Sequence, residues 1–175
     1  MEVNGVRLHH DQALYKEPGG GFTPWHADQQ YWPLASDKSI TAWIPLQQTP
    51  VEMGPLAFAS KSQHFTYGRD LPISDESEAL IQKAIREANF EYVEEPFALG
   101  EVSFHSGWTF HRAGPNSTGK PRAVMTIIYM DKEMHLGAPA NKYQQVDREV
   151  FCPGIGVGEI IDSPKNPVVY SPNIQ

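Results

Sequence analysis

The chain has 175 residues, 40% of them hydrophobic and 20% charged, and its net charge at pH 7 is −7. This length and composition predict a single folded domain over residues 1–175 that buries a core without disulfides. The negative charge argues against nucleic acid and anionic membranes as partners, and no apolar run reaches the roughly 20 residues of a membrane helix. The only cysteine, Cys152, favours a reducing, cytoplasmic location and is expected to be structural rather than catalytic.

Short strands separated by turns are predicted along the first part of the chain. Residues 6–16 form a strand of mixed polarity that a Glu-Pro-Gly-Gly-Gly turn ends. Residues 39–46 are β-branched and aromatic up to a proline, and a Gly-Pro breaker within 49–59 precedes another short apolar strand.

The later part of the chain has one helical pattern and two further strand patterns. A helix is predicted over residues 74–89, with Ser74 as its N-cap and one apolar stripe: Leu80, Ile81, Ala84, Ile85 and Ala88. Strands are predicted at 101–111 and 122–131, and from about residue 136 neither period stands out. The chain is therefore expected to be mainly β, an antiparallel double-stranded β-helix (a cupin-like jelly roll) with one or two peripheral helices. Because few residues precede the first motif, it is expected to be a fragment or to lack N-terminal outer helices.

The stretch Thr-Pro-Trp-His-Ala-Asp places His26 and Asp28 two residues apart. Side chains at i and i+2 of a strand point to the same face, so both can reach one metal ion. Taken alone this pair is weak evidence, because a surface histidine beside a turn-forming aspartate has the same pattern.

A third ligand is available about 80 residues downstream. His105 and His111 both lie in a strand-like run that an antiparallel sheet can return to the first pair. Two histidines and one carboxylate leave positions open on the metal, an arrangement suited to non-haem Fe(II) and O₂ chemistry. A closed zinc site would need more sulfur or nitrogen ligands. We expect His111 to be the third ligand and His105 to be a core or supporting histidine, with a ligand role for His105 as the alternative.

Arg122 opens the very apolar strand that follows. A buried arginine needs an anion, and a carboxylate bound through two hydrogen bonds is the natural partner. That carboxylate belongs either to a ligand or to an internal acid, such as Glu101 or Asp131.

Four segments together, PWHADQQYW, TAWIPL, VEMGPLAF and GWTFHRAGPNSTGKPRAVMTIIY, resemble the phytanoyl-CoA dioxygenase family of Fe(II)- and 2-oxoglutarate-dependent oxygenases. The resemblance covers roughly residues 8–131. It implies that His26, Asp28 and His111 bind the iron. It also implies that Arg122 binds the distal carboxylate of 2-oxoglutarate.

The resemblance also identifies residues around the co-substrate. Trp43 matches a tryptophan that lines the 2-oxoglutarate pocket in the family. Ala27 and Ala113 stand where some members have a glutamine and a serine that contact 2-oxoglutarate. Gln12, on the preceding strand, is a candidate substitute for these contacts, with a solvent-facing side chain as the alternative.

The function expected from this resemblance is oxidation of a small organic substrate by O₂. Decarboxylation of 2-oxoglutarate to succinate and CO₂ would accompany hydroxylation of a C–H bond. Asp28 favours hydroxylation over halogenation, because related halogenases have a small residue at that position. The alternatives are a cupin-type metalloenzyme that does not use 2-oxoglutarate and a non-catalytic jelly-roll binding protein. Neither the identity of the substrate nor the oligomeric state follows from the sequence.

Three other features are expected to be structural. His9, His10 and Asp11 are neighbours on a strand, so they should face opposite ways and form a solvated edge rather than bind one ion. Lys16 is expected to cap the turn that follows it. The helix over 74–89 is expected to be a lid or an outer support.

Overall fold

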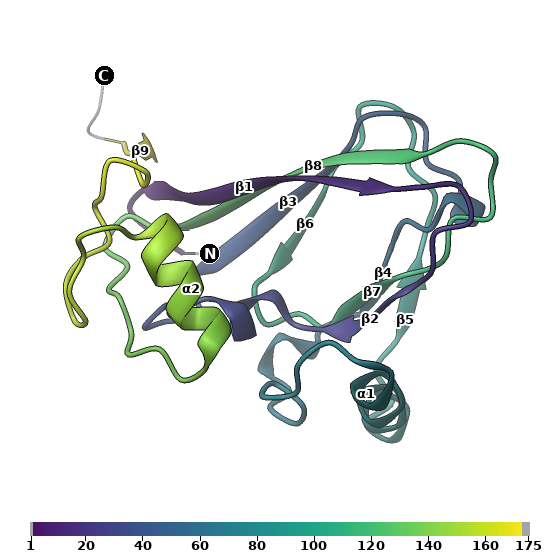
Figure 1. The fold of residues 1–175 in the computed structure, drawn as a ribbon, viewed down its shortest axis with the longest axis horizontal. Coiled ribbons are helices and arrows are strands. Elements are labelled where there is room, and N and C mark those ends of the chain that lie inside the picture. Colours follow the sequence, from purple (N-terminus) through teal and green to yellow (C-terminus); the bar gives the residue numbers. More distant parts are fainter. Residues whose placement is uncertain (1, 173–175) are drawn as a thin grey trace.

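The computed structural model describes residues 2–172, which form two antiparallel sheets that curl around a common interior (Figure 1). The first sheet has the strand order β6-β3-β8-β1-β9, with β1 at Val6–Lys16, β3 at Ser39–Pro45, β6 at Ser103–Ser106, β8 at Arg122–Asp131 and β9 at Val168–Tyr170. The second has the order β2-β7-β4-β5, with β2 at Thr23–His26, β4 at Leu56–Ala59, β5 at Tyr92–Glu94 and β7 at His111–Ala113. This is the mainly β architecture that the alternation of strands and turns predicted.

Short helices complete the fold. The two α-helices, α1 at Asp75–Glu87 and α2 at Lys142–Phe151, lie outside the sheets (Figure 1). Three single-turn 3₁₀ helices occupy connections, η1 at Asp28–Tyr31, η2 at Val51–Met53 and η3 at Ser62–His64. No helix within residues 2–172 has both the length and the apolar character needed to cross a bilayer.

The longest pairing joins β1 and β8, from Lys16 opposite Arg122 to Val6 opposite Asp131. Along β8 buried and partly exposed residues alternate, as expected for a strand that faces an interior on one side. The predicted strands at 6–16 and 122–131 are confirmed with these bounds, and those at 39–46 and within 49–59 correspond to β3 and β4.

The single strand predicted over 101–111 is wrong. The run divides into β6 and β7, which belong to different sheets. A turn separates them, in which the Thr109 N–H donates to the Ser106 carbonyl. Gly107 sits at this turn against the side chains of Ser39 and Gln29, where a Cβ would collide with both. The apolar and aromatic residues around Gly107 have the pattern of a continuous strand. The contact of Gly107 with Ser39 and Gln29, which interrupts the strand, is distant in sequence and leaves no local signal.

Helix α1 supports the second sheet from outside, which is one of the two roles expected of it, a lid or an outer support. Ser74 caps it, because its hydroxyl accepts the Ser77 N–H while the Ser77 hydroxyl accepts the Ser74 N–H. Ile81 and Ile85 are buried in a core cluster formed with Trp25, Ala27, Ala59 and Phe110. The helix therefore holds β2 from outside the barrel, and the predicted helix over 74–89 is confirmed.

Helix α2 was not predicted. Asn141 caps it by accepting the N–H groups of Tyr143 and Gln144. Two of its apolar residues, Val146 and Val150, are 57% and 41% exposed. Residues 142–151 have no continuous apolar stripe, and the region around them is rich in proline and glycine. A helical pattern could therefore not be recognised there.

The prediction for His9 and His10 is also wrong. The β1–β8 pairing shifts between Leu8, opposite Tyr129, and His10, opposite Ile128, so His9 is an extra residue in a β-bulge. The bulge interrupts the strict alternation of side chains. Both histidines are buried, at 0% and 5% exposure, instead of forming a solvated edge.

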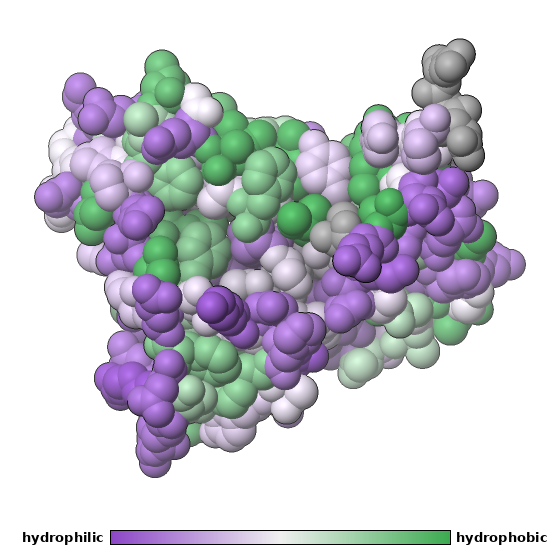
Figure 2. All heavy atoms as spheres, turned by 180° about the vertical axis from the view of Figure 1, so that it is seen from behind, coloured by the Kyte–Doolittle hydropathy of each residue, from purple (hydrophilic) through white to green (hydrophobic). Residues whose placement is uncertain are grey.

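The side of the molecule turned away in Figure 1 is mixed in character (Figure 2). Hydrophobic side chains there form several groups between hydrophilic ones. Among the exposed apolar residues are Leu99, Val102 and Phe104, on and before the edge strand β6. Most of the buried apolar residues that the structure describes lie in separate clusters, of which one is under α1 and another surrounds Trp43.

Candidate active site

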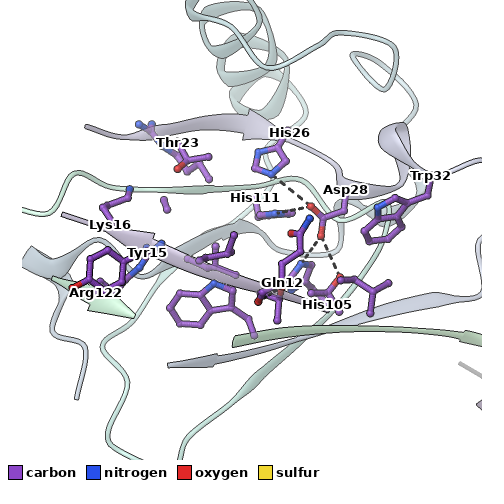
Figure 3. Close-up of a pocket in the computed structure, with 18 residues that line it drawn as sticks. Gln12, Tyr15, Lys16, Thr23, His26, Asp28, Trp32, His105, His111 and Arg122 are labelled. Carbon is purple, nitrogen blue, oxygen red and sulfur yellow. Dashed lines mark hydrogen bonds and ion pairs between the residues drawn. The ribbon is translucent and has the colours of Figure 1, made fainter. Parts of the chain in front are cut away.

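Two neighbouring strands of the second sheet bring a pair of histidines together. His26 ends β2, His111 begins β7, and the two are register partners across the antiparallel pair. Their ring centroids lie 4.3 Å apart. Asp28 begins η1 two residues after His26, so the chain turns its carboxylate back toward both rings (Figure 3).

These three side chains form the first cluster. Asp28 Oδ1 lies 3.6 Å from His26 Nε2 and 3.5 Å from His111 Nε2, and the three ligand atoms lie within 4.8 Å of one another. His26 Nδ1–H donates to the Pro24 carbonyl at 2.7 Å, and His111 Nδ1–H to the Thr109 carbonyl at 3.0 Å. These bonds leave both Nε2 lone pairs free to bind a cation. Burial and then His111 lower the pKa of His26 to about 4, so its ring is neutral at pH 7.

The second oxygen of Asp28 is held by hydrogen bonds. Thr41 Oγ1 donates to Oδ2 at 3.2 Å, and His105 Nε2 donates to the same oxygen at 3.3 Å. Burial raises the pKa of Asp28, but the electrostatic interaction with His111 and the bond from His105 outweigh it and hold that pKa well below its usual range. Asp28 is thus an ionised carboxylate with one oxygen directed at two imidazoles. His105 contacts the opposite oxygen, in the supporting position that was expected of it.

The cluster opens on a cavity of about 310 Å³ between the sheets. Arg122 and Trp43 line its far end, both almost fully buried. The Arg122 guanidinium donates to the Gly54 carbonyl and lies 5.4 Å from the Trp43 ring centroid. Within residues 2–172, Arg122 Nε and Trp43 Nε1 are buried without a hydrogen-bond partner. Two unpaired donors at the end of a cavity favour an anionic ligand there.

The internal ion pair considered for Arg122 is not formed. Asp131 pairs with Lys38 at 3.2 Å, and Glu101 accepts the Ala98 N–H at 2.7 Å. Burial lowers the pKa of Arg122 to about 10, which still leaves the guanidinium charged at pH 7. The charge is therefore available to a ligand in the cavity.

Lys16 lines the same cavity, so its expected role in capping the next turn is wrong. Its side chain is directed inward, only 9% of the residue is exposed, and its Nζ donates to the Gly114 carbonyl at 2.5 Å. Burial and then the charges of Arg122 and Arg112 lower the pKa of Lys16 to about 8. A signal was present in the sequence, since Lys16 lies four residues after Gln12 and shares its face of the strand.

The other residues expected around the co-substrate divide between cavity and core. Gln12 lines the cavity and projects into it from β1 (Figure 3), although its residue is also exposed to solvent, so its contact with a co-substrate stays a prediction. Ala113 also lines the cavity. Ala27 instead belongs to the core cluster beneath β2, with 1% exposure. A longer side chain at position 27 would have to displace packing against Trp25 and Ile81.

Glu78 is a supporting residue that sequence reasoning missed. It lies on α1, where its Oε2 accepts the Trp25 N–H at 2.6 Å. Its Oε1 pairs with Arg112 at 2.8 Å. One carboxylate thus connects the residue before His26 to the residue after His111. No local pattern marks this role, because both contacts cross long stretches of sequence.

The fold is shared with non-haem, alpha-ketoglutarate-dependent enzymes. The structure of the epimerase SnoN from nogalamycin biosynthesis, in complex with Fe³⁺, alpha ketoglutarate and nogalamycin RO, matches 95% of this chain and 66% of its own, with 25% identity and a TM-score of 0.76. The carbocyclase SnoK from the same biosynthesis matches 95% of this chain and 63% of its own, with 23% identity and a TM-score of 0.74. The predicted jelly-roll fold is confirmed by these likenesses.

The chain belongs to the phytanoyl-CoA dioxygenase family, whose model matches residues 2–124. Among curated proteins it is 26% identical over 131 residues to a probable alpha-ketoglutarate-dependent hypophosphite dioxygenase of Stutzerimonas stutzeri. That match covers 71% of this chain and 45% of the relative. The chain thus spans less than two thirds of the relatives it matches.

Proposed function

We propose that this chain is an Fe(II)- and 2-oxoglutarate-dependent dioxygenase that uses O₂ to hydroxylate a small organic substrate, with succinate and CO₂ as co-products. One observation carries the proposal: two imidazoles and an ionised carboxylate converge on a cavity whose far end holds a charged arginine, the Nε of which has no hydrogen-bond partner within residues 2–172. Two histidines and one carboxylate with open positions are the ligand set of non-haem Fe(II) oxygenases.

The first cluster has the ligand types that suit Fe(II), and its imidazoles are already held in the tautomer that metal binding requires. His26 Nε2, Asp28 Oδ1 and His111 Nε2 would hold the iron. Both imidazoles have their other nitrogen engaged by a backbone carbonyl, which fixes the tautomer that a metal ligand needs. When bound, Fe(II) with 2-oxoglutarate supplies the activation of O₂ and the oxidation of the substrate.

The cationic end of the cavity would bind the co-substrate. Arg122 offers its unpaired Nε–H to the distal carboxylate of 2-oxoglutarate, and Trp43 offers the indole N–H beside it. Lys16 adds a second positive charge on the same wall. Gln12 is positioned to donate an amide N–H in place of the contacts that Ala27 and Ala113 do not make.

The cavity also limits the substrate. Its volume of about 310 Å³ is at the small end of the range for small-molecule sites, and the co-substrate would occupy part of it. Trp32, Leu56 and Ile128 give it apolar walls, which favour an organic substrate over an inorganic anion. Asp28 occupies the position that a halide would need, so hydroxylation is proposed rather than halogenation.

Anaerobic titration with Fe(II) and 2-oxoglutarate tests the proposal directly. We expect a visible absorption band from charge transfer between the iron and the bound co-substrate, followed by succinate formation when O₂ is admitted. Arg112→Lys, which keeps a charge in the cavity wall beside His111, serves as the matched control and should retain the band. A folded chain that gives neither band nor succinate contradicts the proposal and favours a non-catalytic binding protein.

The compartment remains a prediction. Cys152 is 1% exposed, and burial and then Asp147 raise the pKa of its thiol to about 12. These properties suit the structural role expected of it, and a cytoplasmic location is proposed on the cysteine count alone.

A further inference from the structure

A second group of metal-ligand side chains lies outside the cavity. His9 and His10 on β1 meet Asp147 on α2, and one nitrogen or oxygen atom from each lies within 4.8 Å of the others. We call these residues the second cluster. The helix lies beside the first half of β1 (Figure 1), and the bulge turns both histidines inward to meet it.

The distances suit a shared ion. His9 Nε2 lies 3.2 Å from Asp147 Oδ1, and His10 Nε2 lies 3.8 Å from Asp147 Oδ2. Ligands about 2.0–2.1 Å from a tetrahedral zinc ion stand roughly 3.3 Å apart, which lies between these two separations. In the first cluster the distances of 3.5 and 3.6 Å both run to one oxygen of Asp28, whereas here each imidazole faces its own oxygen of Asp147.

The three side chains are buried without forming enough hydrogen bonds to one another to offset the loss of water. His9 and Asp147 are 0% and 7% exposed. Within residues 2–172, His9 Nε2 and Asp147 Oδ1 face each other without hydrogen-bond geometry and have no other partner. A buried carboxylate and imidazole left in this state are costly, and a cation between them would satisfy both.

Aromatic rings close the second cluster. The His10 ring stacks on Phe151 at 4.2 Å between centroids and 20° between planes. The Trp32 ring makes T-shaped contacts with both histidines, with its centroid 5.7 Å from that of His9 and 5.8 Å from that of His10. These contacts fix both rings, and the three residues are each at most 7% exposed.

We propose that His9, His10 and Asp147 bind a second divalent transition-metal ion, of which zinc fits best, and that this ion fastens α2 to β1. Two imidazole nitrogens and a carboxylate are ligands that zinc accepts, and a water or the second carboxylate oxygen completes four-coordination. The enclosed position makes the role structural rather than catalytic. The proposal is independent of the function assigned to the first cluster.

The test counts zinc in a chain that has lost the first cluster. The double variant Asp28→Ala/His111→Ala removes two of the first three ligands, so zinc remaining after chelator treatment, reloading and gel filtration reports the second cluster. We expect one ion per chain by mass spectrometry of the metal. Adding Asp147→Asn, which preserves the side-chain shape, should reduce this to none.

A matched variant controls for the loss of a buried carboxylate. Asp131→Asn in the same background removes a buried acid that pairs with Lys38 instead, and it should retain the ion. Zinc at about 100 times its dissociation constant should raise the melting temperature of the double variant by about 5–10 °C, and that of the Asp147→Asn chain not at all.

Circular dichroism establishes whether each chain is folded. If Asp147→Asn unfolds, His10→Phe replaces it, since a phenyl ring can keep the stack on Phe151 while removing the ligand nitrogen. The proposal is overturned if the double variant binds no zinc and gains no thermal stability from it. It is overturned equally if folded Asp147→Asn binds as much zinc as its parent.

Discussion

Residues 2–172 contain two clusters of two histidines and one aspartate, of which one opens on a cavity and the other is enclosed. The first cluster (His26, Asp28, His111) has its carboxylate side chain 22% exposed toward a cavity, whereas the carboxylate of the second cluster (His9, His10, Asp147) is 8% exposed. The cavity side of the first leaves positions for a co-substrate and O₂. Aromatic rings occupy the corresponding space around the second. The same two histidines and one aspartate can therefore suit different roles, because the surrounding residues determine which other ligands can reach a metal bound there.

A single side chain marks the boundary between the two environments. Trp32 lines the cavity and also packs edge-on against both rings of the second cluster. It follows directly after η1, whose first residue is Asp28. The short segment from Asp28 to Trp32 thus contributes a ligand to the first cluster and the aromatic ring that separates the two clusters.

Replacing a ligand of the first cluster should have the largest effect. His111→Ala or Asp28→Ala is expected to lower the rate of succinate formation by more than about 100-fold, because each removes an atom that would bind the iron directly. Succinate release from the iron-loaded chain is the measurement.

His105→Ala is the matched comparison for this prediction. It removes only the bond to the other oxygen of Asp28, so a loss of about 10- to 100-fold with measurable residual activity is expected. If His105→Ala is inactive while His111→Ala retains succinate formation, His105 is the third ligand and the first cluster has been assigned wrongly.

Removing the positive charge at the end of the first cluster's cavity should have the next largest effect. Arg122→Gln is expected to raise the KM for 2-oxoglutarate by roughly 10- to 100-fold, the equivalent of about 1.5–3 kcal/mol for a charged hydrogen bond. Glutamine is two atoms shorter than arginine and also loses the bond to the Gly54 carbonyl, so the melting temperature checks that the variant is folded. Turnover that proceeds without 2-oxoglutarate in both chains would instead favour a cupin-type metalloenzyme of another kind.

Much of the fold could be predicted because its signals are local. β8 alternates buried and partly exposed residues along its length, and α1 has a capping serine followed by an apolar stripe. The pair His26 and Asp28 followed from a two-residue spacing. His111 was preferred to His105 as the third ligand, but the sequence left both open, since only folding shows that His111 faces the Asp28 oxygen that His26 also faces.

The features that were missed depend on contacts distant in sequence or on a break in a regular pattern. Lys16 was taken for a turn residue because the cavity that it faces is formed by strands far along the chain. His9 and His10 were assigned to opposite faces because a bulge cannot be read from alternation. Glu78 has no local mark at all, as its partners lie on β2 and β7.

The support beneath the first cluster should affect stability more than chemistry. Glu78→Gln is expected to lower the free energy of unfolding by about 1–3 kcal/mol, since it removes the charge paired with Arg112 and weakens the bond from the Trp25 N–H. Urea unfolding measures this change. Glu87→Gln on the same helix removes an exposed pair with Lys83 and should stay within about 0.5 kcal/mol of the parent. Equal effects of the two variants would show that Glu78 does not hold β2 and β7 together.

The smallest effect expected is a pH dependence of co-substrate binding that comes from Lys16. Its pKa is lowered to about 8, so its ammonium is charged below that pH and neutral above it. Because 2-oxoglutarate is an anion, the charged form favours its binding, and affinity should be lost as pH rises through about 8. The KM for 2-oxoglutarate is therefore expected to increase about two- to fivefold between pH 7 and pH 9 in the parent chain. Lys16→Met should have the higher KM already at pH 7 and a flat profile over the same range. A parent and a variant with the same slope would place the titrating group elsewhere and leave Arg122 as the cavity's only charge that matters for the co-substrate.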